Sequence, residues 1–436
     1  MPFSALDTAA VARALSQLAE QSEDLVDVFL ERSEVVLLPP DGDPPGFRVT
    51  REEGLAVRLS RGDRTWLAAR DGIEPRSFSE ALRQVARVLP AAAYPEPRLD
   101  VAPWEGPATA EEMATFGPDV QRLLRQEHVA FPLRMTVSRH RRWLQVVGVQ
   151  LVPGPQRESF YSCVVELPWG RFGALLPAVD RDAARWVARQ LLATFRARQA
   201  QPPEPYRGVV VLGPAAAAVL LHEAVAHALE ADTLALGGRP EAAVGVRLGA
   251  PGLHILDDPN AAPEGVRRSA DDEGVPTCRR WLLRDGVVEQ PLADSFWARA
   301  SGELIPGAAR RGNRFSAPAP RSSHLEVLPG ELSAEDLVHD ADGLYLGAAE
   351  RGSLDPLTGE FTLVVPHGRR IRRGEVADPV GRCRLRGFVG DLLGTVQGIG
   401  KDVEHAGAGW CAKGGQKMPV WASTPALRLE GVEVLV

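Results

Sequence analysis

The segment PAAAAVLLHEAVAHALEAD, residues 214–232, decides how the second half of this chain is organised. Alanine and leucine dominate it, and Pro214 suits the first turn of a helix. The pattern predicts a helix over Ala215–Glu230 that is apolar nearly all round and therefore buried. A short apolar run, Gly208–Leu212, comes just before it and predicts a strand.

Within this helix, His222, Glu223 and His227 form the pattern H-E-x-x-x-H. Two imidazoles and a carboxylate so close together are typical of a zinc hydrolase site. The common zinc-protease helix separates its histidines by four positions, whereas five separate them here. At about 100° per residue, five steps place the second ring roughly 140° away from the first. Either the pair is accidental, or the helix is deformed, for example by a one-residue π-bulge that brings the rings together.

A catalytic zinc ion usually has three protein ligands, so one must come from another part of the fold. Cys411 is the best candidate, because the glycine-rich residues 407–416 leave backbone room around its sulfur. Two imidazoles and one thiolate match the preferences of zinc. Glu230 and Asp232 are interpreted either as acceptors that orient an imidazole or as solvated residues at the helix end. The remaining cysteines, Cys163, Cys278 and Cys383, are interpreted as small hydrophobic residues.

The bulk composition describes an ordinary globular protein. The chain has 436 residues, 44% of them hydrophobic, and its net charge of −7 argues against a general DNA-binding surface. The first residues lack the basic and apolar regions of a signal peptide, and no run of about 18 apolar residues could cross a membrane. Four cysteines do not make a disulfide scaffold, so we expect a cytoplasmic protein. Only three of the 50 basic residues are lysines: Lys401, Lys413 and Lys417.

The pattern along the chain predicts an α+β fold in two domains. Asp24–Leu38 alternates as a strand does, and Arg181–Gln199 is typical of a helix. The adjacent prolines at 202 and 203 stop both helix and sheet. We therefore expect a mixed α+β N-terminal domain over residues 1–200 and a β-rich C-terminal metallopeptidase domain over residues 206–436, with the metal-binding helix buried near the start of the second domain.

With these motifs, the chain resembles the TldD/PmbA family of metalloproteases, also called modulators of DNA gyrase. The resemblance is closest to the TldD-type, metal-bearing branch of that family. The resemblance spans about residues 50 to 436 and is densest after 205. Two alanines, Ala226 and Ala412, replace glycines beside the candidate ligands, and Glu350–Gly352 stands where the family has a glycine pair. The blocks that follow the family's order are His222–Asp232, Asp271–Gly274, Leu283–Val287, Gly312–Arg314, Pro318–Arg321, Asp355–Phe361, Ile399–Asp402 and Cys411–Val420.

This resemblance implies that His222, His227 and Cys411 are zinc ligands and that Glu223 is the general base that activates a zinc-bound water. It implies a peptidase for unfolded or extended peptides, including precursors from which a leader is removed. It also implies a dimer, either a homodimer or a heterodimer with a PmbA-type subunit. The alternative is a catalytically silent dimer subunit or a regulatory interaction protein of the same family.

Some assignments stay open at this level. Arg314 and Arg321 are candidates to steady the oxyanion or a substrate carboxylate, or are surface arginines. Asp272 and Glu273 are candidate substrate-binding residues that line either the site or only a turn. A nucleic-acid-associated regulator would rest on the arginine clusters at 310–311 and 369–373, and the net charge opposes it.

Overall fold

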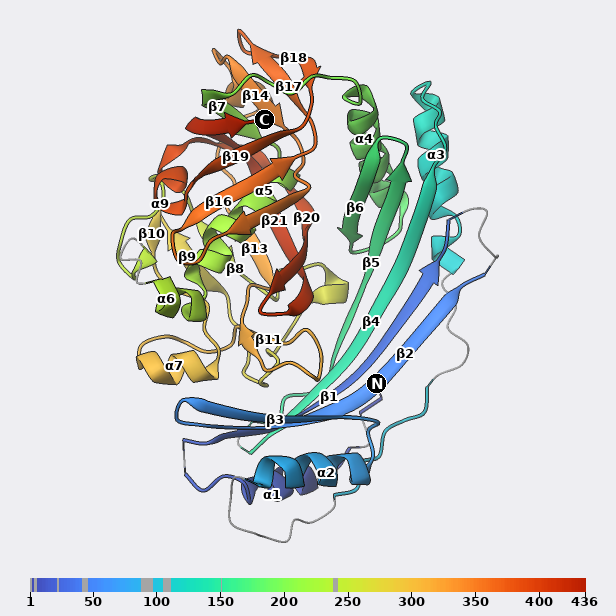
Figure 1. Ribbon diagram of the computed structural model, residues 1–436, viewed down its shortest axis with the longest axis vertical. Helices are drawn as coiled ribbons and strands as arrows, with labels where there is room; N and C mark the ends of the chain where they lie inside the picture. The colour runs from blue at the N-terminus through green and yellow to red at the C-terminus, as the bar shows by residue number, and fades with distance from the viewer. Residues whose placement is uncertain are drawn as a thin grey trace.

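The computed structural model describes residues 2–3, 6–21, 23–40, 46–87, 97–104, 111–149, 151–237 and 242–436. Figure 1 shows two large sheets, each with its own helices. One is a six-stranded sheet and the other a thirteen-stranded sheet, so the fold is α+β as predicted. All strands of the first sheet precede residue 200 and all strands of the second follow residue 205. We retain 1–200 and 206–436 as the proposed domains.

The first sheet is antiparallel throughout, in the order β3-β2-β1-β4-β5-β6. Its helices lie near the two ends of the long strands (Figure 1): α1 and α2 pack at one end, α3 and α4 at the other. The elements are α1 Thr8–Ser16, β1 Leu25–Leu38, β2 Arg48–Arg61, β3 Arg64–Asp71, α2 Pro75–Ala86, η1 Glu111–Met113, α3 Phe116–Gln126, β4 Arg134–Gly148, β5 Gln156–Leu167, β6 Gly170–Leu176 and α4 Arg181–Arg196.

Strand β1 explains how this sheet joins the rest of the molecule. Successive side chains of a strand point to opposite faces. Val26, Val28 and Leu30 belong to the core under α1 and α2. The alternate residues Asp27 and Glu31 are each only 3% exposed, so the polar face of the strand is buried as well. That face lies against loops of the second half of the chain, where buried arginines contact both carboxylates.

The second sheet is organised around β21, which pairs with β7, β13, β19 and β20. The strands are β7 Tyr206–Leu212, β8 Ile255–Asp257, β9 Arg280–Arg284, β10 Val287–Val288, β13 His324–Val327, β14 Gly343–Leu346, β15 Arg351–Leu354, β16 Glu360–Val365, β17 Gly368–Arg372, β18 Glu375–Val380, β19 Cys383–Phe388, β20 Val396–Lys413 and β21 Gln416–Leu435; β11 Ala309–Arg310 and β12 Ala319–Pro320 form a separate pair.

Short helices complete this half of the chain. The first of them, α5, begins at Pro214 as the sequence predicts and lies in the largest hydrophobic cluster, among residues of β7, β13, β16 and β21. This cluster buries the helix on every side, which accounts for its uniformly apolar sequence. The helices are α5 Pro214–Leu221, η2 His222–Ala226, η3 His227–Leu229, α6 Ala231–Gly237, η5 Glu264–Val266, α7 Ser295–Ser301, α8 Ala334–Val338, α9 Val389–Leu392 and η6 Leu393–Thr395.

Buried ion pairs connect the two halves. The guanidinium of Arg58, on β2, contacts Asp27 of β1 and lies 2.5 Å from a carboxylate oxygen of Glu273 in the second half. The guanidinium of Arg311 reaches Asp27 from the other side, at 2.8 Å. All four side chains are at most 4% exposed. A buried charge is costly unless it is paired, so each half of the chain satisfies charges that the other half buries.

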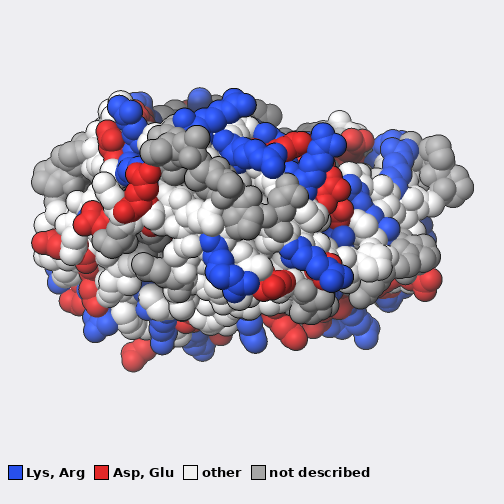
Figure 2. Space-filling model, turned by 90° about the horizontal axis from the view of Figure 1, so that it is seen from below, with Lys and Arg blue, Asp and Glu red and all other residues white. Residues whose placement is uncertain are grey.

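The molecular surface carries charges of both signs. On the face seen in Figure 2, the described Lys and Arg side chains are interspersed with Asp and Glu. Among the described residues, no helix is long and apolar enough to cross a membrane.

Replacing Arg58 with Met is expected to lower the free energy of unfolding by about 3–5 kcal/mol, because it leaves buried carboxylates without their cation. Urea denaturation followed by tryptophan fluorescence measures this loss. Arg76→Met is the control, since it removes only the exposed ion pair with Glu80, and it should leave the unfolding curve unchanged. Equal curves for the two variants would contradict a stabilising role for the buried pairs.

Candidate metal centre

The helix that carries the two histidines is deformed where its sequence predicts. Regular α-helix ends at Leu221, and His222–Ala226 forms a π-helical turn, followed by a short 3-10 turn at His227–Leu229. The backbone N–H of His227 donates to the carbonyl of His222, which is the i→i+5 bond of a π turn. The widened turn brings the two rings to a centroid separation of 4.5 Å. The predicted deformation is therefore confirmed.

The tip of the β20–β21 hairpin brings Cys411 to these rings. Its sulfur lies 3.3 Å from Nε2 of His227, and one donor atom from each of the three residues lies within 4.8 Å of the others. Two tetrahedral zinc ligands, a nitrogen and a sulfur, are about 3.5 Å apart when each is at its usual distance from the ion. His222, His227 and Cys411 are all buried, at 3%, 8% and 3% exposure.

His222 provides a separate test of whether these residues fit a metal. Both of its ring nitrogens are buried and neither has a hydrogen-bond partner among the described residues. Burial lowers the pKa of His222 to about 3, so the ring is neutral and can offer a lone pair. An unpartnered buried nitrogen is costly, and a metal ion would satisfy it. The donor set of two imidazoles and one thiol therefore fits a zinc ion.

His227 is held by a carboxylate on the side away from Cys411. Its Nδ1 lies 2.8 Å from Oε2 of Glu230, which is fully buried. Burial alone would raise the pKa of Glu230, but His227, Lys413 and Arg321 outweigh it and lower that pKa to about 2. The ionised carboxylate thus fixes the orientation of the imidazole, as acceptors behind metal-binding histidines commonly do. Of the two interpretations of Glu230, the structure supports the orienting one.

Glu223 follows His222 directly in the π turn, interacts electrostatically with His227 and is only half-buried. Among the described residues it has no hydrogen-bond or ion-pair partner, and burial raises the pKa of its carboxyl group. Gly352, on β15, lies against its side chain: a Cβ at position 352 would overlap Cγ of Glu223. The absence of a side chain at Gly352 therefore leaves space for the Glu223 side chain between the π turn and β15. Within the described chain, β15 pairs only with β16.

The other predicted site residues divide into two groups. Arg321 lies near the metal centre, with its guanidinium 3.8 Å from Glu230. Arg314, Asp272 and Glu273 belong instead to the buried contact between the two halves of the chain. Arg314 pairs with Glu52 and Asp71 of the first half, and Glu273 pairs with Arg58 of the first half. Asp272 accepts from the backbone of Arg311 and from Arg268, which itself pairs with Glu158 of the first half.

Two residues of the site went unrecognised in the sequence. Lys413 donates to Glu230 and Asp232, just after the candidate ligand His227, and Gly352 makes room for Glu223. A weak signal existed for the lysine, because lysine is rare in this arginine-rich chain and all three lysines lie within residues 401–417. Gly352 belongs to the segment Glu350–Gly352, where the family has a glycine pair, but no local pattern connects it with Glu223, 129 positions earlier in the chain.

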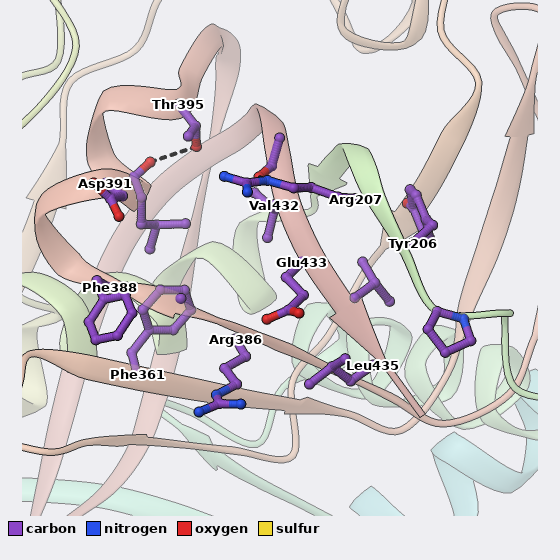
Figure 3. Close-up of a pocket in the computed structure, with 15 residues that line it drawn as sticks. Tyr206, Arg207, Phe361, Arg386, Phe388, Asp391, Thr395, Val432, Glu433 and Leu435 are labelled. Carbon is purple, nitrogen blue, oxygen red and sulfur yellow. Dashed lines mark hydrogen bonds between the residues drawn. The ribbon is translucent and has the colours of Figure 1, made fainter.

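A separate pocket of about 510 Å³ lies where the ends of β7, β19 and β21 meet α9. Figure 3 shows Glu433 and Arg386 on neighbouring strands at its middle, with Phe361 and Phe388 together at one side. None of the candidate metal ligands lines it. The pocket is therefore distinct from the metal centre.

Comparison with known proteins places these features in a family. The model of the PmbA/TldA metallopeptidase C-terminal domain matches residues 205–435, which hold the whole candidate metal centre. A Metalloprotease of Methanothermobacter thermautotrophicus is 34% identical over 241 residues, 55% of this chain and 52% of that protein. A protein of Saccharolobus solfataricus named Zinc metalloprotease TldD homolog is 25% identical over 251 residues, 56% of each chain. The chain thus spans about half the length of these curated relatives.

The fold agrees with this match over nearly the whole chain. The crystal structure of TldE from Thermococcus kodakarensis superposes with a TM-score of 0.75 at 18% sequence identity, covering 98% of this chain and all of that one. At such an identity the likeness concerns the fold alone. The sequence match over more than half of the residues shows that the chain belongs to the PmbA/TldA metallopeptidase family.

Proposed function

We propose that this protein is a zinc-dependent peptidase that hydrolyses unfolded or extended peptides. One observation carries the proposal: His222, His227 and Cys411 converge in a buried cluster, with both nitrogens of His222 unpartnered and Glu223 beside them. Zinc is favoured over harder cations because the donors are imidazole and thiol, with no oxygen ligand among them. The name of one relative, a zinc metalloprotease, supports the same choice.

The chemistry divides between the metal and the carboxylate. When bound, zinc lowers the pKa of water to about 7 and polarises a carbonyl group. Glu223 takes up the proton of the attacking water and delivers it to the leaving amine nitrogen. Glu230 holds the ring of His227, and the apolar surroundings of α5 exclude bulk water from the cluster.

The neighbourhood of Glu223 supports an extended peptide as substrate. Strand β15 passes beside Glu223 at Gly352 and, within the described chain, has one edge without a partner strand. An extended peptide can add to such an edge through its backbone, which makes recognition largely independent of side chains. Precursor peptides from which a leader is removed are one class of substrate of this kind.

The metal assignment predicts that the purified protein holds about one zinc ion per chain. His222→Ala, His227→Ala and Cys411→Ser should each lower this content, because each removes one of three ligands. Elemental analysis after gel filtration measures it. Cys278→Ser is the control, since this cysteine is exposed and belongs to no cluster of metal-binding side chains among the described residues. Little zinc in the wild type would favour the silent-subunit alternative.

Glu223→Gln is expected to keep zinc and to lower the rate of peptide hydrolysis by about 10²–10⁴-fold, the usual contribution of a general base. The assay uses unstructured fluorogenic peptides, with the protein alone and with any co-expressed homologue. Equal rates for the wild type and this variant would refute the assigned base.

Gly352→Ala is expected to push the side chain of Glu223 aside, because the new Cβ would overlap its Cγ. A displacement of about 1 Å at a catalytic group costs on the order of 10²-fold in rate. Zinc content should stay unchanged, since Gly352 contacts the base and not the ligands. The matched control is Gly173→Ala on strand β6, where a Cβ would meet nothing within 4 Å. Unchanged kcat in Gly352→Ala would show that the glycine does not position the base.

A further inference from the structure

Lys413 connects the two parts of the chain that carry the candidate ligands. It follows Cys411 by two residues, at the end of β20. Its ammonium nitrogen lies 2.5 Å from Oε2 of Glu230, 2.6 Å from Oδ1 of Asp232 and 3.1 Å from the hydroxyl of Thr233. All three acceptors lie just after His227 in the sequence, so one side chain ties the hairpin to the segment that follows the π turn.

These contacts form a closed loop. The sulfur of Cys411 lies 3.3 Å from Nε2 of His227, whose Nδ1 lies 2.8 Å from Glu230. The same oxygen of Glu230 accepts from Lys413, and the backbone returns to Cys411. Movement of the hairpin relative to the helix would therefore break a contact on both sides of the His227 ring.

The loop has the properties of a stiff element. Glu230 is fully buried, and the lysine side chain is only 24% exposed, so water competes weakly for the ion pair. Lysine presents a compact charge with three donors, and here three acceptors surround it. The guanidinium of Arg321 lies 3.8 Å from Glu230 and donates instead to the backbone carbonyls of Pro320 and Lys413.

We propose that Lys413 and Glu230 act together as positioning residues that hold His227 and Cys411 at the spacing a metal needs. The inference rests on the proposed zinc site. It goes further because it makes the zinc affinity of that site depend on the ion pair between Lys413 and Glu230, neither of which is a ligand. Groups that orient metal-binding histidines typically change metal affinity by about 10–100-fold when they are lost.

The test measures zinc affinity directly, by competition with a chromophoric chelator, in the full-length protein. Lys413→Met and Glu230→Gln should each weaken zinc binding by about 10–100-fold. The double variant should be little weaker than either single variant, because both break the same contact. Lys417→Met is the matched control: Lys417 is in the same hairpin but lies over the ring of Trp410, and its loss should leave the affinity unchanged.

A second readout separates positioning from general stability. With cobalt in place of zinc, the visible absorption bands should shift in Lys413→Met and Glu230→Gln, because the geometry of the ligands changes. Urea unfolding of the metal-free proteins shows whether the fold is retained. Should Lys413→Met fail to fold because it leaves Glu230 without its cation, the double variant, which removes both charges, provides the measurement.

The outcomes are distinct. A wild-type protein that binds no zinc overturns the proposed function and this inference with it. Wild-type affinity and an unchanged cobalt spectrum in Lys413→Met and Glu230→Gln, together with loss of zinc in Cys411→Ser, overturn the inference alone. Additive losses in the double variant also overturn it, because they would show that the two residues act independently.

Discussion

One backbone hydrogen bond, from the N–H of His227 to the carbonyl of His222, sets the geometry on which the candidate metal centre depends. In a regular α-helix the bond would span one residue fewer, and the two rings would point apart. The extra residue in the turn interrupts the regular i→i+4 hydrogen bonds of the helix, which costs free energy. Ala224, Val225 and Ala226 of the turn belong to the largest hydrophobic cluster of the described residues, whose packing offsets this cost.

The same principle, a local cost offset by the surroundings, governs the contact between the two halves of the chain. Asp27 and Glu31 lie on the polar face of β1, and that face is buried by loops of the second half. Paired charges in this contact require good geometry to be stable. These pairs therefore join the first sheet to loops of the second half through contacts of fixed partners.

Much of the fold and the centre of the site could be predicted from the sequence. The periodic spacing of apolar residues predicted strand β1 and helix α4, because local backbone geometry fixes which residues share a face. The spacing of His222 and His227 predicted that the helix is deformed between them if the rings meet, and the structure shows a π turn there. The roles of Arg314, Asp272 and Glu273 could not be predicted, because sequence does not tell which charged residues are buried. Lys413 was missed because its partners lie some 180 residues away.

The distance along the chain between the donors has a consequence for how the protein is made. His227 and Cys411 are 184 positions apart, and the hairpin that carries Cys411 pairs with several strands of the second sheet through β21. A growing chain therefore has a two-histidine fragment of the site long before it has the sulfur. The three donors of the candidate metal centre therefore come together only when nearly the whole second sheet is assembled.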